Sequence, residues 1–282
     1  MIRGKYLGLV VGLFILPFIA FSQPVKTVND TLFDYFQALR TTQEFNQKMV
    51  INEKIKNVFR RILSQDKYYE HSFDTIKSMG VVSSPDEAFR IINWNTMDGD
   101  GTYTYHAFIQ YRPKKRDEIK LTELIDHSDS IIMPEQQILP PDQWYGALYY
   151  EIVPAKINKQ MQYVLLGWDG GDIYINRKVI DVLTFSSSGK PKFGKNVFKF
   201  GKKRKKRVIF EFSYQATMRL FYDDNIDMIV FEHMTPIRPS LKDQKMQYGS
   251  DLTFDGLELV DDKWILRENL DVKNDKKSLR RK

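Results

Sequence analysis

The chain has 282 residues, of which 42% are hydrophobic and 13% aromatic, and its formal net charge is +7. This length and composition exclude a wholly disordered or fibrous chain and predict a globular body with a sizeable core. The chain contains no cysteine, which excludes a disulfide framework, a thiol nucleophile and lipid attachment through a cysteine.

Residues 1–22 have the pattern of a secretory signal peptide. Arg3 and Lys5 form a basic start, an apolar stretch containing Pro17 follows, and the segment AFS places small residues at −3 and −1 before Gln23. The alternative is a retained membrane anchor, because the apolar run approaches the roughly 20 residues that span a bilayer. We predict cleavage and export to the periplasm or medium of a Gram-negative bacterium, with no transmembrane anchor left afterwards.

Residues 23–80 are predicted to form a helical segment. Apolar side chains recur there at spacings of three and four, and no Gly or Pro interrupts the stripe. Asn29 or Asp30 can cap its start, so one or two amphipathic helices are expected over residues 29–64, with a shorter one near 72–79. Such a stripe typically packs on its own domain, and binding of a partner is the alternative.

Between residues 81 and 272 the period of the apolar side chains changes to two, which predicts strands. The alternating stretches include TYTYHAFIQY, QMQYVLLGW, KVIDVLTF, RVIFEFSYQ and DMIVFEHM, and turn sequences such as MDGDG and YDDN separate them. Short connections favour antiparallel neighbours, so a meander of eight or more strands is expected. Residues 112–146 contain several prolines and are expected to form an irregular insertion or flap.

The predicted fold class is therefore α+β: N-terminal amphipathic helices followed by a predominantly antiparallel β body that is barrel-like or sandwich-like. A propeller is less favoured, because the tryptophans show no fixed repeat along the chain; they are Trp94, Trp144, Trp168 and Trp264. Residues 273–282 are predicted to be a basic disordered tail.

A run of six consecutive cations interrupts the β body. It consists of Lys202, Lys203, Arg204, Lys205, Lys206 and Arg207. Because alternating stretches flank the run, we predict a solvated hairpin loop whose charges make no essential contacts. Once the signal peptide is removed, the tail carries +5 and residues 23–272 are neutral overall, so the run and the tail are candidate contacts with an anionic envelope surface. Export argues against nucleic acid as a partner.

Several short segments lie between residues 83 and 266: LLGWDGG, KVIDVLTF, PKFG, RVIFEFS, MIVFEHM and TFDGLELVDDKW. In this combination, and with the signal end AFSQ, the chain resembles a family of exported, uncharacterised proteins from Bacteroidota. The resemblance implies export and the architecture described above. It implies no activity and no catalytic residue.

Two turns carry candidate binding residues. In GWDGGD, Trp168 stands beside Asp169 and Asp172. A core tryptophan is the favoured interpretation, and the alternative is an exposed indole that stacks on a sugar ring while the carboxylates bond its hydroxyls. In MDGDGT, Asp98 and Asp100 resemble part of a calcium loop. The distal Glu of such a loop is absent, so a glycine-rich hairpin turn is favoured there.

Common catalytic signatures are absent from the sequence, which has no Gly-x-Ser-x-Gly, phosphate loop or His-Glu-x-x-His. The histidines stand far apart, and each is expected to be a surface or hydrogen-bonded residue; they are His71, His106, His127 and His233. The sequence therefore predicts no cofactor and no metal.

Two classes of function remain open. The first is a non-catalytic envelope protein, binding or structural, whose partner is a glycan, an anionic surface or a protein. The second is a glycan hydrolase whose paired carboxylates, among Glu151, Asp169, Glu211 and Glu232, meet only in the folded chain. Such a pair needs a separation of about 5 Å for retention or about 6.5–9.5 Å for inversion of stereochemistry.

Overall fold

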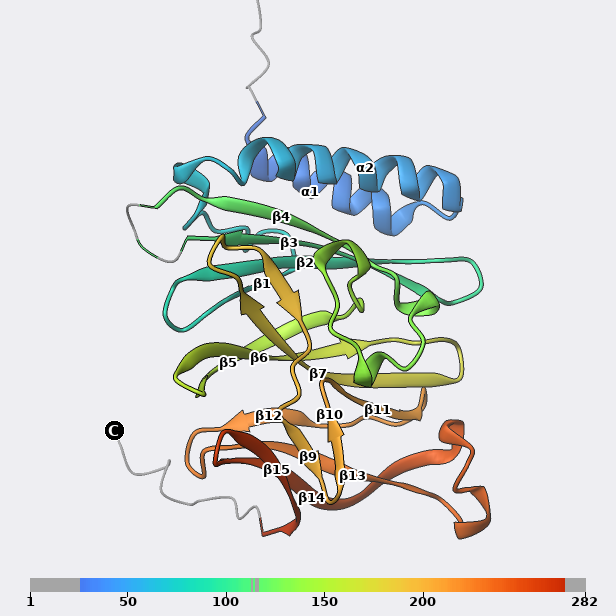
Figure 1. Ribbon diagram of the computed structural model, residues 1–282. Coiled ribbons are helices and arrows are strands. Elements are labelled where there is room, and N and C mark those ends of the chain that lie inside the picture. Colours follow the sequence, from blue (N-terminus) through green and yellow to red (C-terminus); the bar gives the residue numbers. More distant parts are fainter. Residues whose placement is uncertain (1–25, 113, 115–116, 272–282) are drawn as a thin grey trace, which may run out of the picture.

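A computed structural model describes residues 26–112, 114 and 117–271. Two helices lie on a stack of three successive β-sheets, so the chain forms four layers (Figure 1). The helices precede the strands and the sheets are open, which confirms the α+β fold class in its sandwich-like form. The predicted signal peptide, 1–22, and the predicted tail, 273–282, lie outside the described residues.

The helical layer consists of α1 (Val28–Thr41) and α2 (Phe45–Ile62). Thr27 caps α1, two positions before Asn29, the nearer of the two caps expected from the sequence. Its hydroxyl accepts a hydrogen bond from the backbone N–H of Asp30 (3.1 Å), and the Asp30 carboxylate accepts one from the N–H of Thr27 (3.0 Å). This reciprocal capping box satisfies two N–H groups that a helix start otherwise leaves unpaired.

The prediction of a short helix near 72–79 is wrong. Only turns follow the 3₁₀ segment after α2, and β1 begins at Gly80, where the change of period was predicted. Phe73 and Ile76 are buried beneath the helical layer, and a turn joins them through a hydrogen bond from Ile76 N to Phe73 O (2.9 Å). Their apolar spacing of three therefore reflects a buried turn, because so short a stretch cannot offset the cost of nucleating a helix.

The sheets follow one another along the chain with little exchange. The first sheet contains β1 (Gly80–Ser83), β2 (Phe89–Met97), β3 (Tyr103–Tyr111) and β4 (Lys120–Ile125). The second contains β5 (Leu148–Ile157), β6 (Gln160–Asp169), β7 (Ile175–Phe185), β8 (Pro191–Phe193) and β11 (Val208–Ser213). The third contains β9 (Phe198–Phe200), β10 (Lys203–Lys205), β12 (Leu220–Asp223), β13 (Met228–Pro236), β14 (Tyr248–Val260) and β15 (Lys263–Leu270). Within the described chain, only β9 and β15 pair in parallel.

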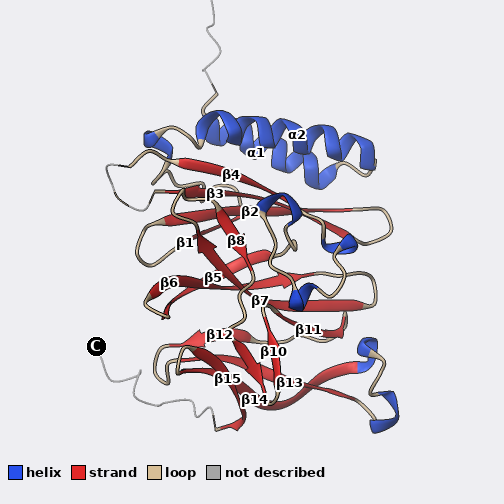
Figure 2. Cartoon of the chain, in the orientation of Figure 1, coloured by secondary structure: helices blue, strands red, loops and turns tan. Residues whose placement is uncertain are grey.

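Short 3₁₀ segments occupy several connections (Figure 2). They are η1 (Asp66–Tyr68), η2 (Ser128–Ser130), η3 (Pro134–Gln136), η4 (Pro141–Gln143), η5 (Pro239–Leu241) and η6 (Lys245–Gln247). Three of these, η2 to η4, lie in the segment expected to be irregular. That expectation missed β4, which forms the edge of the first sheet against β3. Charged and half-exposed side chains on β4 hide its alternation, since Leu124 alone among its residues is fully buried.

Each pair of neighbouring layers encloses its own hydrophobic core. Phe36, Phe59 and Trp94 lie between the helices and the first sheet, with 5.4 Å between the ring centroids of Phe59 and Trp94. The first and second sheets enclose a core that contains Trp144, and the second and third enclose one that contains Trp264. No helix in the described residues is long and apolar enough to cross a membrane.

Candidate functional site

The basic run is not a uniform solvated loop, and that prediction was wrong. Gly201 and Lys202 do turn a hairpin, but the hairpin joins β9 to β10, and residues 203–205 form β10 itself. The chain then crosses from the third sheet to β11 in the second. Exposure falls along the run, from the exposed Lys202, Lys203 and Arg204 to the fully buried Arg207.

Arg207 forms an ion pair inside the protein. Its Nε donates a hydrogen bond to Oδ2 of Asp181 (2.6 Å), and both side chains are 0% exposed. Its Nη1 donates to the carbonyl oxygen of Pro134 (2.7 Å), which ties η3 to the sheets. Burial raises the pKa of the Asp181 carboxyl, and the guanidinium partly offsets that rise. A charge enclosed in this way has a structural role.

The residues just before Arg207 also bind the segment around η3. Lys205 Nζ lies 2.6 Å from a carboxylate oxygen of Glu135, and Lys206 Nζ donates to the carbonyl of Gln136 (2.5 Å). Glu135 further accepts a hydrogen bond from the N–H of Ile209 (3.0 Å). The second half of the run therefore makes internal contacts. Contact with an anionic surface remains a prediction for the exposed first half alone.

The candidate site at Trp168 does not present its carboxylates to solvent. Asp169 is 4% exposed and accepts hydrogen bonds from the hydroxyls of Tyr105 (3.0 Å) and Tyr145 (3.1 Å). Asp172 accepts a hydrogen bond from the N–H of Tyr174 (2.7 Å), and Trp168 is half-buried. These contacts order the turn, and Asp169 is engaged inside the protein. Sugar binding, the minority interpretation of this turn, stays a prediction for the half-buried Trp168 and Asp172.

Each of the four carboxylates considered for catalysis forms a hydrogen bond or an ion pair inside the protein. Asp169 and Glu211 share Arg177, whose guanidinium lies 3.3 and 3.1 Å from their oxygens. Glu232 accepts a hydrogen bond from Arg219 N (2.7 Å), and Glu151 accepts one from Tyr222 N (3.2 Å). Burial raises the pKa of Glu151. Arg177 therefore bridges Asp169 and Glu211, so that both carboxylates are tied to one guanidinium.

The histidines are dispersed, as the sequence predicts. His71 bonds Asn29, His106 bonds Asn52 and Thr96, and His233 pairs with Asp255. Burial lowers the pKa of His106 to about 3, so this side chain is a neutral core residue at physiological pH. Among the described residues, no group of three or more His, Asp or Glu is arranged to hold a metal ion.

The turn with Asp98 and Asp100 is a hairpin, as the sequence favours. Asp98 N donates to the carbonyl oxygen of Thr102 (2.9 Å), and Gly101 takes a φ of +86° that glycine adopts readily. Asp100 uses its carboxylate to accept hydrogen bonds from the N–H (3.0 Å) and hydroxyl (2.7 Å) of Thr102. Both carboxyl groups therefore support the turn itself, because Asp98 likewise accepts a hydrogen bond from Gly99 N (2.6 Å).

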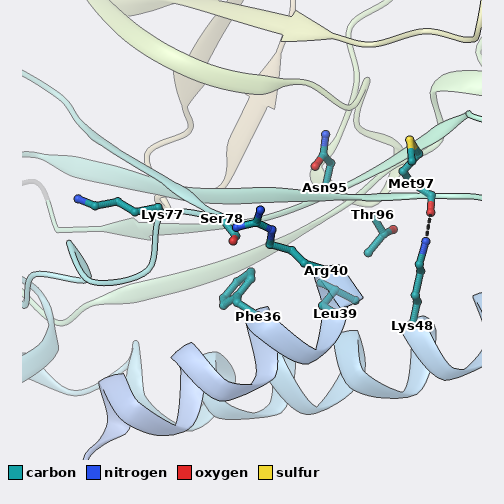
Figure 3. A pocket seen from close by; sticks show the side chains of 9 residues that line it. All are labelled: Phe36, Leu39, Arg40, Lys48, Lys77, Ser78, Asn95, Thr96 and Met97. Atoms are coloured by element: carbon teal, nitrogen blue, oxygen red, sulfur yellow. Dashed lines mark hydrogen bonds between the residues drawn. The ribbon is translucent and has the colours of Figure 1, made fainter. Parts of the chain in front are cut away.

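A pocket of about 430 Å³ lies between the helical layer and the end of β2 (Figure 3). Phe36 and Leu39 rise from α1 at its base, and Thr96 points toward them from the strand. We call this the cationic pocket, because its lining includes Arg40, Lys48 and Lys77. The remaining lining residues are Ser78, Asn95 and Met97.

The charged residues that line the cationic pocket are all positive. No Asp or Glu lines it, and within the described chain none of its three cations forms an ion pair with a carboxylate. Lys48 Nζ donates to the carbonyl of Met97 (2.8 Å), which holds the ammonium at one end. Arg40 projects from α1 toward the strand side of the pocket, and Lys77 extends outward at the far rim (Figure 3). The pocket thus offers uncompensated positive charge to a ligand.

The helix macrodipoles add little to this potential, because the negative C-terminal end of α1 at Leu39 and Arg40 adjoins the positive N-terminal end of α2 at Lys48. Lys48 belongs to the first turn of α2, which contains no acidic residue. Sequence reasoning missed this site because its cations come from three separate segments. A usable signal was present in α2, since natural helices favour acidic residues in the turn where Lys48 stands.

Comparison with known proteins finds no matching family model, no matching curated protein and no matching solved structure.

Proposed function

We propose that the chain is an exported, non-catalytic binding protein of a Gram-negative cell envelope, and that the cationic pocket binds a small anionic ligand. The ligand carries carboxylate or phosphate groups. The observation that carries the proposal is the convergence of Arg40, Lys48 and Lys77 on one pocket that no carboxylate lines among the described residues. Cations that no internal carboxylate pairs are free to pair with a ligand's charge.

The chemistry of the lining supports an anion over a neutral ligand. A guanidinium such as that of Arg40 can bind a carboxylate or phosphate through two parallel hydrogen bonds. The lining hydroxyl of Ser78 and amide of Asn95 can add neutral hydrogen bonds that fix a ligand's orientation. A volume of about 430 Å³ exceeds that of an inorganic ion and suits a small organic anion.

Export and the absence of catalysis are parts of the proposal that rest on other observations. Export is supported by the signal-like pattern of residues 1–22. A binding role is supported by the internal engagement of the carboxylates that a glycan hydrolase would need, with Asp169 and Glu211 bridged by Arg177. No observation favours the hydrolase as a second candidate.

The proposal is tested by calorimetric titration of the mature protein with citrate and with pyrophosphate, using sorbitol as a neutral comparison. We expect at least one anion to bind and sorbitol not to bind. Arg40→Gln and Lys48→Gln should each weaken anion binding about ten-fold, the equivalent of one charge-assisted hydrogen bond. Binding should also weaken at high salt, because the pocket is open to solvent.

Lys54→Gln is the matched control, since Lys54 lies exposed on α2 outside the pocket lining. It removes the same charge from the same helix and should leave anion binding unchanged. Equal losses in Lys54→Gln and Lys48→Gln would show that net charge alone attracts the anion. That result, or the failure of both anions to bind, would contradict the proposed site.

A further inference from the structure

A second groove lies at the opposite end of the molecule from the helices, where β11 meets η6 and the start of β14 (Figure 1). It has a volume of about 330 Å³. Its lining combines tyrosine rings with aliphatic and neutral polar side chains: Tyr174, Tyr214, Tyr248, Ile237, Met246, Ala216, Ser213, Gln215, Gln247 and Gly249. We call it the tyrosine groove.

From the composition of this lining we propose that the tyrosine groove binds a neutral glycan. The inference is independent of the function proposed for the cationic pocket, because the two sites share no residue.

The first argument is the absence of charge. Charged residues make up 28% of the chain, yet none of the described residues that line the groove is charged. The described lining therefore offers a charged ligand no counter-charge, and Lys245, which adjoins it, is engaged over the ring of Tyr248. The complementary ligand is uncharged.

The second argument is the exposure of the rings. Tyr174 and Tyr214 are 53% and 52% exposed, and within the described residues neither ring stacks on another aromatic side chain or a cation. Lys245 lies over the ring of Tyr248 (3.9 Å to the centroid), so that ring has one face already occupied. Two free rings beside Ile237, itself 67% exposed, form an apolar surface that water covers in the unbound protein.

The third argument is that the backbone that carries the two tyrosines is held in place. Tyr214 N donates to the carbonyl of Tyr174 (2.9 Å), and Asn176 Nδ2 donates to the carbonyl of Tyr214 (3.2 Å). Asp172 accepts a hydrogen bond from the N–H of Tyr174 (2.7 Å). The turn in which the sequence offered a possible sugar site thus positions the backbone of Tyr174. An ordered backbone reduces the conformational entropy that is lost when a ligand binds.

The fourth argument is the polar complement. Gln215 Nε2 donates to the hydroxyl of Tyr214 (2.9 Å), while Gln247 and Ser213 add a further amide and a hydroxyl to the lining. A purely apolar ligand would leave these groups desolvated and unpaired. A sugar ring offers both an apolar C–H face for an aromatic side chain and hydroxyl groups at its edge for amides. A sugar therefore matches the groove better than a charged ligand or a purely apolar ligand does.

The test is calorimetric titration with three neutral probes: cellohexaose, maltohexaose and the hexamer of N-acetylglucosamine. We expect at least one to bind, and its affinity to be unchanged in 0.5 M salt because no charge pair contributes. Tyr174→Ala and Tyr214→Ala should each weaken binding about ten-fold or more, as for aromatic anchors at other interfaces. Tyr214→Phe keeps the ring and should retain most of the affinity.

Phe33→Ala is the control, since Phe33 is 42% exposed on α1, outside the groove. Wild-type affinity in Tyr174→Ala and Tyr214→Ala, or no binding of any probe, would overturn the proposal. So would a wild-type dimer in sedimentation that Tyr214→Ala converts to monomer, because a second copy would then occupy the groove. Loss of oligosaccharide binding in Arg40→Gln alone would assign the glycan to the cationic pocket and also overturn it.

Discussion

Replacing Arg207 with Met should destabilise the protein strongly. The change removes the only positive partner that the structure shows for Asp181, which is 0% exposed, and leaves its buried carboxylate with neutral hydrogen-bond donors alone, such as the N–H of Val182. Breaking a buried ion pair from one side costs about 3–5 kcal/mol. For a chain of this size, that loss corresponds to a fall of about 6–20 °C in melting temperature.

Arg204→Met is the matched control, since it makes the same replacement three positions earlier in the run at an exposed residue. Its free energy of unfolding should change by less than about 0.5 kcal/mol. The double variant Arg207→Met/Asp181→Asn removes both charges, so its free energy of unfolding should fall less than that of Arg207→Met alone. The remaining loss of about 1–3 kcal/mol comes from the buried amide of the introduced side chain, whose hydrogen bonds are incomplete.

The loss of stability in Arg207→Met should depend on pH. Without the guanidinium, burial raises the pKa of Asp181 further above its unfolded value, because nothing offsets desolvation. A group with a raised folded pKa stabilises the fold below its unfolded pKa, and that contribution is lost as pH rises through the folded value. The difference from wild type in urea unfolding should therefore be larger at pH 8 than at pH 5.

Two outcomes would refute this reasoning. Stability of Arg207→Met within about 0.5 kcal/mol of wild type would show that the guanidinium is not needed inside the protein. Equal losses in Arg207→Met and Arg204→Met would show that the run acts through its total charge rather than through Asp181.

Three further predictions concern other sites. Burial lowers the pKa of His106 to about 3, so below about pH 6.5 the unfolded chain binds a proton that the folded chain does not. The free energy of unfolding in urea should therefore fall by about 2–3 kcal/mol by pH 4.5, and His106→Gln should remove that fall. The same dependence of stability on pH in His106→Gln and wild type would contradict this prediction. Gly146→Ala should lower the free energy of unfolding by about 1–3 kcal/mol, because the added Cβ would lie 2.5 Å from the Asp126 carboxyl. Gly99→Ala is the control and should be neutral, because its Cβ would meet nothing within 4 Å. Equal effects of the two changes would argue against the contact with Asp126. Mass spectrometry of protein from the native host should give Gln23 as the first residue, and intact Met1 would refute export.

Periodicity predicted the main elements because it reports burial directly. The change from three-and-four spacing to alternation falls at Gly80, where β1 begins. β4 was missed because edge strands carry charged side chains that blur alternation. The helix expected near 72–79 failed for the opposite reason, since a turn buries Phe73 and Ile76 at helical spacing.

The role of the basic run was mistaken because charge alone does not reveal a partner. Arg207 is paired with Asp181, 26 positions earlier in the chain. The sequence did contain a signal: Asp181 stands in the strand KVIDVLTF, where a carboxylate among apolar residues calls for a buried partner. Which of the chain's 43 cations supplies that partner depends on how the sheets stack, and local spacing does not encode it.

The two concave sites were equally hidden from the sequence. Arg40, Lys48 and Lys77 come from α1, α2 and the turn before β1, and they meet only when the helices lie on the first sheet. The tyrosine groove likewise joins the second and third sheets. Tyr174 and Tyr214 are separated by 40 positions, and no motif connects them.

Chemical-shift mapping of the mature, isotope-labelled protein with pyrophosphate tests the central claim most directly. If the cationic pocket is the ligand site, the largest amide shifts should fall at the C-terminal end of α1, in the first turn of α2 and at Asn95, Thr96 and Met97. Arg40→Gln should require about ten-fold more pyrophosphate to produce that pattern, and Lys54→Gln should leave the titration unchanged. Shifts that cluster instead along the exposed Lys202, Lys203 and Arg204, or that are absent at saturating pyrophosphate, would contradict the account.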